Sequence, residues 1–517
     1  MLSKPSVNLV SWNPQFFREI KGRLKLRNVA IAISASLICQ FLAIMIFFVQ
    51  LPVKSGPDVV IYNRYCLKTG KYCTDINWSY WSLDIFITFS WILFLLILLG
   101  GVYMLVADFA KEERLGTLNF IRLSPQHSHN ILLGKLLGVP ILIYLAAAIG
   151  LPLHLWAIIS SNLSLYWFFE FYGILIIVCC FFYNASLLFV FLGGTQAWLA
   201  ATIAGIFLLP FMAGGQGYIY AVAKGMSGIK EAQIIIGVMI LGLVLGSYWI
   251  WQAVNRRYRN PNATVISKKQ SYWLVGTSQI YLLLFFLQYI GTKSIYNLRE
   301  SIFVLCTINF CWFLLVIALL SPQRQTLQDW ARYRHQQVNN DQTAIVKGLA
   351  LSLKQDLIWG EKSPALVAIA INLVITAAIW ISWILLWSQN SIKLSGILTV
   401  IISLNLILIY AAIAQLILLM KVKKPVIWAT AILSGLIVLP PVALLLASIT
   451  PDKFPNLWLF STFPWISLPY KFAPTTPMLI AIIAQWSVSI LVTLQLTRKI
   501  RKLGESNSQK LLTAQNN

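Results

Sequence analysis

The chain has 517 residues, of which 58% are hydrophobic and 11% are charged, and its mean hydropathy is +0.75. A soluble domain carries roughly 25% charged residues because water must wet its surface, so these values exclude a chain built only of soluble domains. The net charge is +24, with 40 Lys and Arg against 16 Asp and Glu. Such an excess is typical of nucleic-acid binding or of the basic loops of a multi-pass membrane protein, and the positions of the charges decide between them.

Twelve apolar stretches have about the length that a helix needs to cross roughly 30 Å of hydrocarbon. With the N-terminus in the cytoplasm, Lys and Arg are about twice as dense on the cytoplasmic side as outside, whereas acidic residues have about the same density on both sides. The sequence therefore predicts an all-α, polytopic integral membrane protein with about twelve transmembrane helices, both termini cytoplasmic, and no nucleic-acid partner. The predicted spans are residues 29–51, 85–107, 136–160, 166–192, 198–213, 232–254, 272–291, 301–320, 364–387, 394–420, 425–449 and 476–497.

A helix is expected in the first 28 residues, before the first span. Asn13 can cap its start and Pro14 fits the first helical position. Aromatic and basic residues follow at helical spacing, which predicts an interfacial amphipathic helix in contact with membrane lipids.

Beyond this helix we expect four consecutive segments along the chain, some of them bounded by charge and some by hydropathy. They are a first six-helix half at 29–254, with a cytoplasmic element at 108–135, a basic linker at 255–271, a second six-helix half at 272–497 and a disordered tail at 498–517. The second half is not established as a repeat of the first, because the match of 29–33 with 367–371 pairs span nine with span one, whereas two equal halves pair span seven with span one.

Two of the seven cysteines stand apart from the five that lie in spans. Cys66 and Cys73 belong to the outer loop at 52–84. The stretch between them contains a Thr-Gly pair that can turn the chain. In an oxidising compartment they can form a disulfide, but sequence spacing does not show that the side chains meet, so two free thiols stay an alternative.

The cytoplasmic segment between spans two and three is the most informative. It reads Glu112-Glu113-Arg114-Leu115-Gly116-Thr117-Leu118, followed by Ser124-Pro125. Charged residues lead into a short amphipathic helix that Pro125 ends, which predicts a surface for a partner. Gly134 and Gly138 then have the spacing of a close helix contact, and we interpret them as a packing feature.

This block, together with the stretch at 131–138, resembles the signature of type-2 ABC exporter permeases. The resemblance covers residues 1 to about 258. It implies that the segment is a coupling helix that docks into an ATP-binding subunit, and that the glycine-rich stretch at 213–228 is a re-entrant outer hairpin. The implied docking residues are Glu112, Glu113, Arg114, Gly116, Thr117, Leu118, Ser124 and Pro125.

The resemblance implies a permease subunit of an ATP-driven exporter, in a bacterial-type inner or plasma membrane. The chain contains no phosphate-binding loop, so ATP and Mg²⁺ are expected on a separate subunit, and no catalytic residue, cofactor or metal site is expected here. The second half lacks the Gly-Thr-Leu block. The chain is therefore either a complete two-half pore or one member of a homodimer with six additional helices.

Two other functions are alternatives to the exporter. A membrane glycosyltransferase that uses lipid-linked sugar would employ acidic residues of the first outer loop, where Asp58, Asp75 and Asp84 lie. An ion-coupled secondary transporter would need ionisable groups within the spans, where Glu170 and His154 are candidates.

Overall fold

The computed structural model of the chain forms two compact units, Met1–Pro261 and Asn262–Asn517, and each is described by itself. The boundary falls within the basic segment expected at 255–271. The structure describes residues 12–52, 63–69, 72–207, 209, 214, 229–287, 294–340, 346–468, 470 and 473–504. The re-entrant hairpin expected at 213–228 lies outside the described residues, apart from Gly214.

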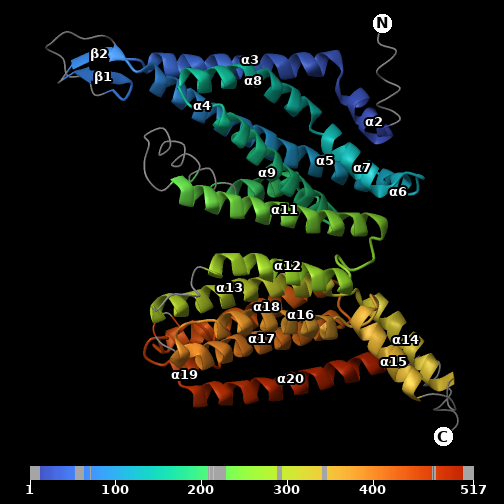
Figure 1. Cartoon of the computed structure of the whole chain (residues 1–517). Coiled ribbons are helices and arrows are strands. Elements are labelled where there is room, and N and C mark those ends of the chain that lie inside the picture. Colours follow the sequence, from blue (N-terminus) through green and yellow to red (C-terminus); the bar gives the residue numbers. More distant parts are fainter. Residues whose placement is uncertain are drawn as a thin grey trace. The chain divides into compact units, whose positions relative to one another are not determined.

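The first unit consists of helices and one β-hairpin, and the hairpin lies at the opposite end of this unit from α6 (Figure 1). A shorter apolar helix at Ala197–Phe207 precedes α11. The other elements are α2 (Pro14–Arg23), α3 (Leu26–Val49), β1 (Cys66–Thr69), β2 (Tyr72–Ile76), α4 (Trp78–Leu95), the π-helix η1 (Leu96–Gly100), α5 (Gly101–Arg114), α6 (Thr117–Arg122), α7 (Ser128–Gly138), α8 (Ile141–Ser160), α9 (Tyr166–Phe191) and α11 (Ile229–Arg259).

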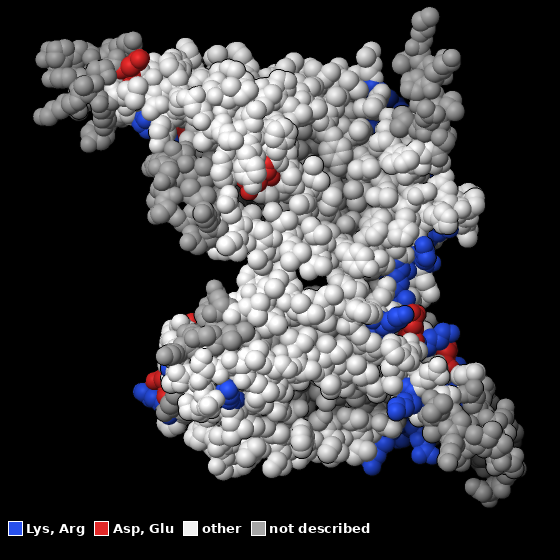
Figure 2. All heavy atoms as spheres, viewed as in Figure 1, with Lys and Arg blue, Asp and Glu red and all other residues white. Residues whose placement is uncertain are grey.

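The described residues of the second unit form helices and the segments that connect them. Basic residues on its drawn face gather mainly near the end where α14 and α15 lie, and a broad uncharged surface covers the middle of its helices (Figure 2). Its elements are α12 (Lys268–Phe286), α13 (Ile295–Leu320), α14 (Arg324–Asn340), α15 (Val346–Trp359), α16 (Leu366–Leu385), α17 (Asn390–Leu418), α18 (Pro425–Leu446), α19 (Pro455–Trp458) and α20 (Thr475–Gly504).

Ten helices of the described chain are long and apolar enough to cross a membrane, which confirms an all-α, multi-pass membrane protein. Each of the twelve predicted spans overlaps a helix, but two of those helices fall outside the ten. The span expected at 198–213 meets the short helix Ala197–Phe207, and the span at 272–291 meets α12. α12 begins with two lysines and has polar residues at 277–279, which lower its hydropathy.

Three of the contacts between helices occur in the same order in both units. In the first unit α3 packs on α8, α5 on α9 and α9 on α11; in the second, α12 packs on α16, α13 on α17 and α17 on α20. This order matches α12 with α3 and α16 with α8. This correspondence is the one expected for two equal halves, in which span seven corresponds to span one. The short sequence match of 29–33 in α3 with 367–371 in α16 does not agree with it.

The long helix that runs from Trp78 to Arg114 contains the π-helical turn η1. The extra residue of such a turn leaves a backbone carbonyl without its usual partner. The Tyr183 hydroxyl of α9 donates a hydrogen bond of 2.5 Å to the carbonyl oxygen of Ile97, and Gly101 provides the space because any Cβ there would overlap the Tyr183 ring. The irregular turn is therefore built into the contact between this helix and α9.

The start of α2 agrees with the prediction from the sequence, whereas the end of α20 does not. Asn13 caps α2, and its Oδ1 accepts a hydrogen bond of 3.0 Å from the backbone N–H of Phe16, as the Asn-Pro pair predicts. The disordered tail expected from residue 498 is wrong in its first part, because α20 continues to Gly504 and its Leu503 packs near Leu327 of α14. Residues 505–517 lie outside the described residues.

Candidate functional site

α6 is joined to α5 by a tight turn at Gly116. Gly116 has φ +72°, in the left-handed region that glycine adopts without strain, and it directly follows the last turn of α5. The Thr117 hydroxyl, at the start of α6, donates a hydrogen bond of 3.2 Å to the carbonyl oxygen of Glu112. The Gly-Thr pair therefore sets the direction in which α6 leaves α5.

The inner face of α6 is anchored to three other helices of the first unit. Leu118 is 3% exposed and belongs to the same hydrophobic core as Phe109 of α5. The Arg122 guanidinium lies 5.5 Å from the ring centre of Tyr258 in α11 and 5.9 Å from that of Phe191 in α9. Burial lowers the pKa of Arg122, which nevertheless stays charged at neutral pH.

Three large apolar side chains in α6 and directly beside its two ends are not covered by the first unit. Leu115 is 66% exposed, Phe120 is 81% exposed and Leu123 is 85% exposed. We call these three residues the α6 patch. Charged Glu113 and Arg114 are exposed beside it. Several exposed large apolar residues within a short charged segment are typical of an interaction surface.

Six charged side chains from α2, α5 and α7 meet behind α6, and we call them the ion cluster. Lys135 is fully buried at its centre, with its Nζ 2.6 Å from Asp108 Oδ2, 2.8 Å from Glu112 Oε1 and 3.5 Å from Glu19 Oε1. Arg23 Nη2 donates a hydrogen bond of 2.5 Å to Asp108 Oδ1. The cluster consists of Arg18, Glu19, Arg23, Asp108, Glu112 and Lys135.

The ion cluster is balanced, with three cations and three carboxylates. Burying a charge is costly unless it is paired and hydrogen-bonded, so each member depends on the others. Glu19, Asp108 and Glu112 have the arrangement of metal ligands, but the Lys135 ammonium lies within 3.5 Å of an oxygen of each. The cluster is thus an internal salt bridge that fastens α2 and α7 to the end of α5.

α2 sits on α7 at two glycines. A Cβ on Gly134 would lie 2.7 Å from the backbone nitrogen of Phe16, and a Cβ on Gly138 would lie 2.6 Å from Glu19 Cβ. The Asn13 amide also donates a hydrogen bond of 2.7 Å to the carbonyl oxygen of Asn130. The glycine spacing is therefore the close helix contact that the sequence predicts, and its partner is the N-terminal helix.

α7 is held to the end of α11 by polar contacts. The Trp251 indole N–H donates a hydrogen bond of 3.1 Å to His129 Nδ1, and Arg259 Nε donates one of 2.9 Å to the Ser128 hydroxyl. Burial, Arg259 and His127 all lower the pKa of His129, in that order of size. The His127/His129 pair thus contributes one hydrogen-bonded side chain and one exposed side chain.

The structure divides the residues expected to form the docking element into two groups. Glu112 and Leu118 point into the first unit, one to the ion cluster and one to the hydrophobic core. The exposed members are Glu113, Arg114, Gly116, Thr117 and Pro125, and Ser124 is half-buried.

Four residues that matter here were not among the expected site residues: Glu19, Asp108, Arg122 and Lys135. A signal existed for part of this set. Lys135 interrupts an apolar run and needs a countercharge, and Asp108 and Glu112 share one face of a helix at i, i+4 spacing.

The acidic residues of the first outer loop do not form a reactive cluster in the described chain. Asp84 is 4% exposed, and its carboxylate accepts hydrogen bonds of 2.6 Å from Arg64 Nη2 and 2.7 Å from the Tyr65 hydroxyl. The Asp75 carboxylate accepts a hydrogen bond from the next backbone N–H, and Asp58 lies outside the described residues. Asp84 therefore fastens the β-hairpin to α4.

Cysteine bonding in the hairpin can be stated for Cys66. The hairpin pairs Thr69 with Tyr72. Cys66 is disulfide-bonded, whereas Cys39, Cys179, Cys180, Cys306 and Cys311 are free. The side chain of Cys73 lies outside the described residues.

His154 and Glu170 have different surroundings. His154 is fully buried, with Nε2 2.9 Å from the Ser90 hydroxyl and Nδ1 2.9 Å from the Tyr172 hydroxyl, and its ring stacks on Phe86. Both ring nitrogens are thus satisfied, as in a structural histidine. Glu170 Oε2, by contrast, is buried and accepts no hydrogen bond.

Compared with protein-family models, with curated proteins and with solved structures, the chain has no match.

Proposed function

We propose that the chain is the permease subunit of an ATP-driven exporter, with α6 docking on a separate ATP-binding subunit. In this proposal the helices Ala197–Phe207 and α12 complete twelve crossings, both termini are cytoplasmic, and the membrane is an inner or plasma membrane. The second unit supplies the second half of the pore, with α14 and α15 in the position that α6 has in the first.

The α6 patch is the observation that carries the proposal. Leu115, Phe120 and Leu123 are each at least 66% exposed. Leaving large apolar side chains in water forgoes roughly 1.5–3 kcal/mol each, relative to burial. A protein partner that covers the patch recovers this energy, and Glu113 and Arg114 beside it provide charges that select its orientation.

The anchoring of α6 explains how docking would move the helices. The turn at Gly116 and the ion cluster join α6 to α5, so a displacement of α6 acts on the long helix below η1. Arg122 carries the same displacement to α9 and α11 through Phe191 and Tyr258. Closure of an ATP-binding partner would thereby rock α5, α9 and α11 between inward and outward access.

Co-purification of the chain with a candidate ATP-binding cassette subunit tests the proposal. Replacing Phe120 and Leu123 by Ser removes the two most exposed residues of the α6 patch without disturbing buried contacts. We expect the affinity for the partner to fall by about tenfold or more, since anchor residues at interfaces each contribute about 2 kcal/mol. Glu113→Lys should also weaken the complex.

Leu67→Ser is the matched control, because Leu67 is 48% exposed in β1, at the end of the first unit opposite to α6, and lies outside the α6 patch. An unchanged complex after Phe120→Ser with Leu123→Ser would contradict the docking assignment. Gly116 is unsuitable for this test, since its positive φ strains any larger residue.

A further inference from the structure

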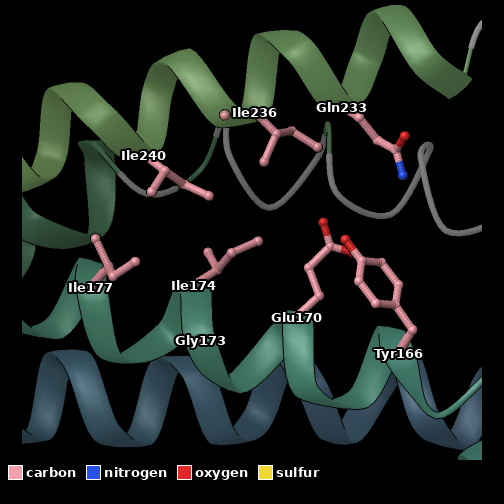
Figure 3. Close-up of a pocket in the computed structure, with 9 residues that line it drawn as sticks. Tyr166, Glu170, Gly173, Ile174, Ile177, Gln233, Ile236 and Ile240 are labelled. Carbon is pink, nitrogen blue, oxygen red and sulfur yellow. The ribbon is translucent and has the colours of Figure 1, made fainter.

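A cavity of about 470 Å³ lies between α9 and α11, at the end of the first unit opposite to α6. Glu170 and Tyr166 from α9 and Gln233 from α11 point into the space between the two helices (Figure 3). Its volume is in the range of small-molecule sites. None of the residues of the α6 patch or of the ion cluster lines this cavity.

The cavity has a polar end and an apolar end. The three polar side chains lie within the first turns of the described parts of α9 and α11, and isoleucines of both helices continue the wall inwards to Ile177 and Ile240. From Glu170 to Ile177 the wall extends over two helical turns, about 10 Å. Such a lining fits a molecule with a polar head and an alkyl chain.

Two glycines create the space. A Cβ added to Gly173 or to Gly237 would meet no heavy atom within 4 Å, although both residues line the cavity. At Gly246, by contrast, a Cβ would lie 2.7 Å from Phe181, so that glycine is required by the packing of α11 on α9. Gly173 and Gly237 thus serve no close helix contact, and their effect is to leave the cavity open.

The charge of the site defines its ligand. Glu170 Oε2 is buried without a hydrogen bond, and none of the described lining residues is Lys, Arg or His. A carboxylate in an apolar wall is costly unless a cation or a hydrogen-bond donor reaches it. An anionic head would be repelled, whereas an ammonium group would supply both the charge and the donors.

We infer that this cavity binds an amphiphile with an ammonium head, which Glu170 holds, and an alkyl chain that lies along the isoleucines. Gln233 and Tyr166 add hydrogen bonds to the polar part of the ligand. This chemistry is shared by an aminophospholipid of the bilayer and by a soluble alkylamine. If the proposed exporter function holds, the site is also placed to respond to ATP, because Arg122 contacts the other ends of α9 and α11.

Photolabelling of the full chain in phosphatidylcholine nanodiscs tests the site without any ATPase. The probe is dodecylamine with a diazirine on its chain, and labelled peptides are identified by mass spectrometry. We expect labels on α9 and α11 that unlabelled dodecylamine displaces and dodecyl sulfate, with the same chain and an anionic head, does not. A second set of nanodiscs, half phosphatidylethanolamine, separates the sources: loss of labelling identifies the bilayer lipid, and retained labelling identifies a soluble amine.

Glu170→Gln should reduce labelling by about tenfold, the usual effect of losing a charge-assisted hydrogen bond. Gly237→Leu should abolish it by filling the cavity, and the fold should persist because Leu is a better helix former than Gly and its Cβ meets no heavy atom within 4 Å. The matched controls are Glu300→Gln, a half-buried acid of α13 that accepts a hydrogen bond from the Tyr296 hydroxyl, and Gly276→Leu, a glycine of α12 that also has open space beside it. Equal labelling of wild type, Glu170→Gln and Gly237→Leu, or displacement by dodecyl sulfate, would overturn the inference. Because only binding is measured, failure of the exporter proposal leaves this result unaffected.

Discussion

The Lys135 ammonium lies 2.6 Å from the Asp108 carboxylate, although the two residues are on different helices and Lys135 is completely buried. This pair joins the end of α5 to α7, and the rest of the ion cluster adds α2 to the same point. The segment that leads to α6 is therefore held by charge as well as by apolar packing.

Removing Lys135 should strongly destabilise the first unit. In Lys135→Met, Asp108 and Glu112 lose their shared countercharge, and breaking a buried ion pair from one side costs about 3–5 kcal/mol. Denaturant titration in detergent micelles, followed by tryptophan fluorescence, measures the free energy of unfolding. Lys111→Met is the control, because Lys111 is exposed and should change stability by less than about 0.5 kcal/mol.

A double variant distinguishes pairing from simple loss of volume. Asp108→Asn in the Lys135→Met background removes one of the carboxylates left without a partner, so we expect part of the lost stability to return. If Asp108→Asn instead lowers the free energy of unfolding of Lys135→Met by as much as it lowers that of the wild type, the two residues are not coupled.

Enlarging Gly134 should detach α2 from α7. The Cβ of Gly134→Leu would collide with the Phe16 backbone, which cannot move without displacing the helix. Hydrogen exchange should then show lower protection of α2, and trypsin should cleave faster after Arg18 and Arg23. Gly22→Ala, whose added Cβ meets nothing within 4 Å, should leave both measurements unchanged; equal effects of the two substitutions would refute the close contact.

The lowered pKa of His129 predicts a dependence of stability on pH. The unfolded state binds a proton near pH 6.5, whereas the folded state resists protonation because His129 is desolvated and Arg259 is close. The contribution of His129 is therefore complete above about pH 6.5 and decreases as the pH falls through the folded-state pKa. Unfolding of wild type and His129→Asn between pH 7.5 and about pH 5 should show a weaker pH dependence in the variant, and parallel curves would contradict this prediction.

The two ends of the first unit should be labelled from opposite sides of the membrane. In a background without the five free cysteines, Thr117→Cys on α6 should react with an impermeant maleimide only from the cytoplasmic side. Ser164→Cys, at the exposed turn before α9, should react only from outside. Labelling of Thr117→Cys from the exterior would place α6 away from any cytoplasmic ATPase and would remove the basis of the proposed function.

The elements that follow from short stretches of chain were predictable. A run of about 20 apolar residues favours a helix that crosses the membrane whatever lies elsewhere in the chain, so each of the twelve predicted spans overlaps a helix. Two of these helices fall short of a span. Ala197–Phe207 is too short and comes from the shortest predicted run, and α12 has too low a hydropathy and comes from one of the most polar runs. Asn13 and Pro14 likewise act within one helical turn, and the start of α2 follows from them.

The candidate site was predictable only in part, because its contacts join distant positions. The Gly-Thr turn is local and could be recognised, but which side of α6 faces outwards depends on Leu118 and Arg122 meeting residues of other helices. Ser-Pro and Glu112 were expected at a partner surface, whereas the position of Lys135 draws Glu112 inwards.

The sequence by itself determined that this chain is a helical membrane protein with a short, charged element after its second span, since hydropathy and helix caps act over neighbouring residues. Only the tertiary structure decided which charges neutralise one another, which face of α6 remains bare, and that Glu170 and Gln233 share a cavity. Those relationships depend on distances through space between residues that are far apart along the chain, and no local pattern encodes them.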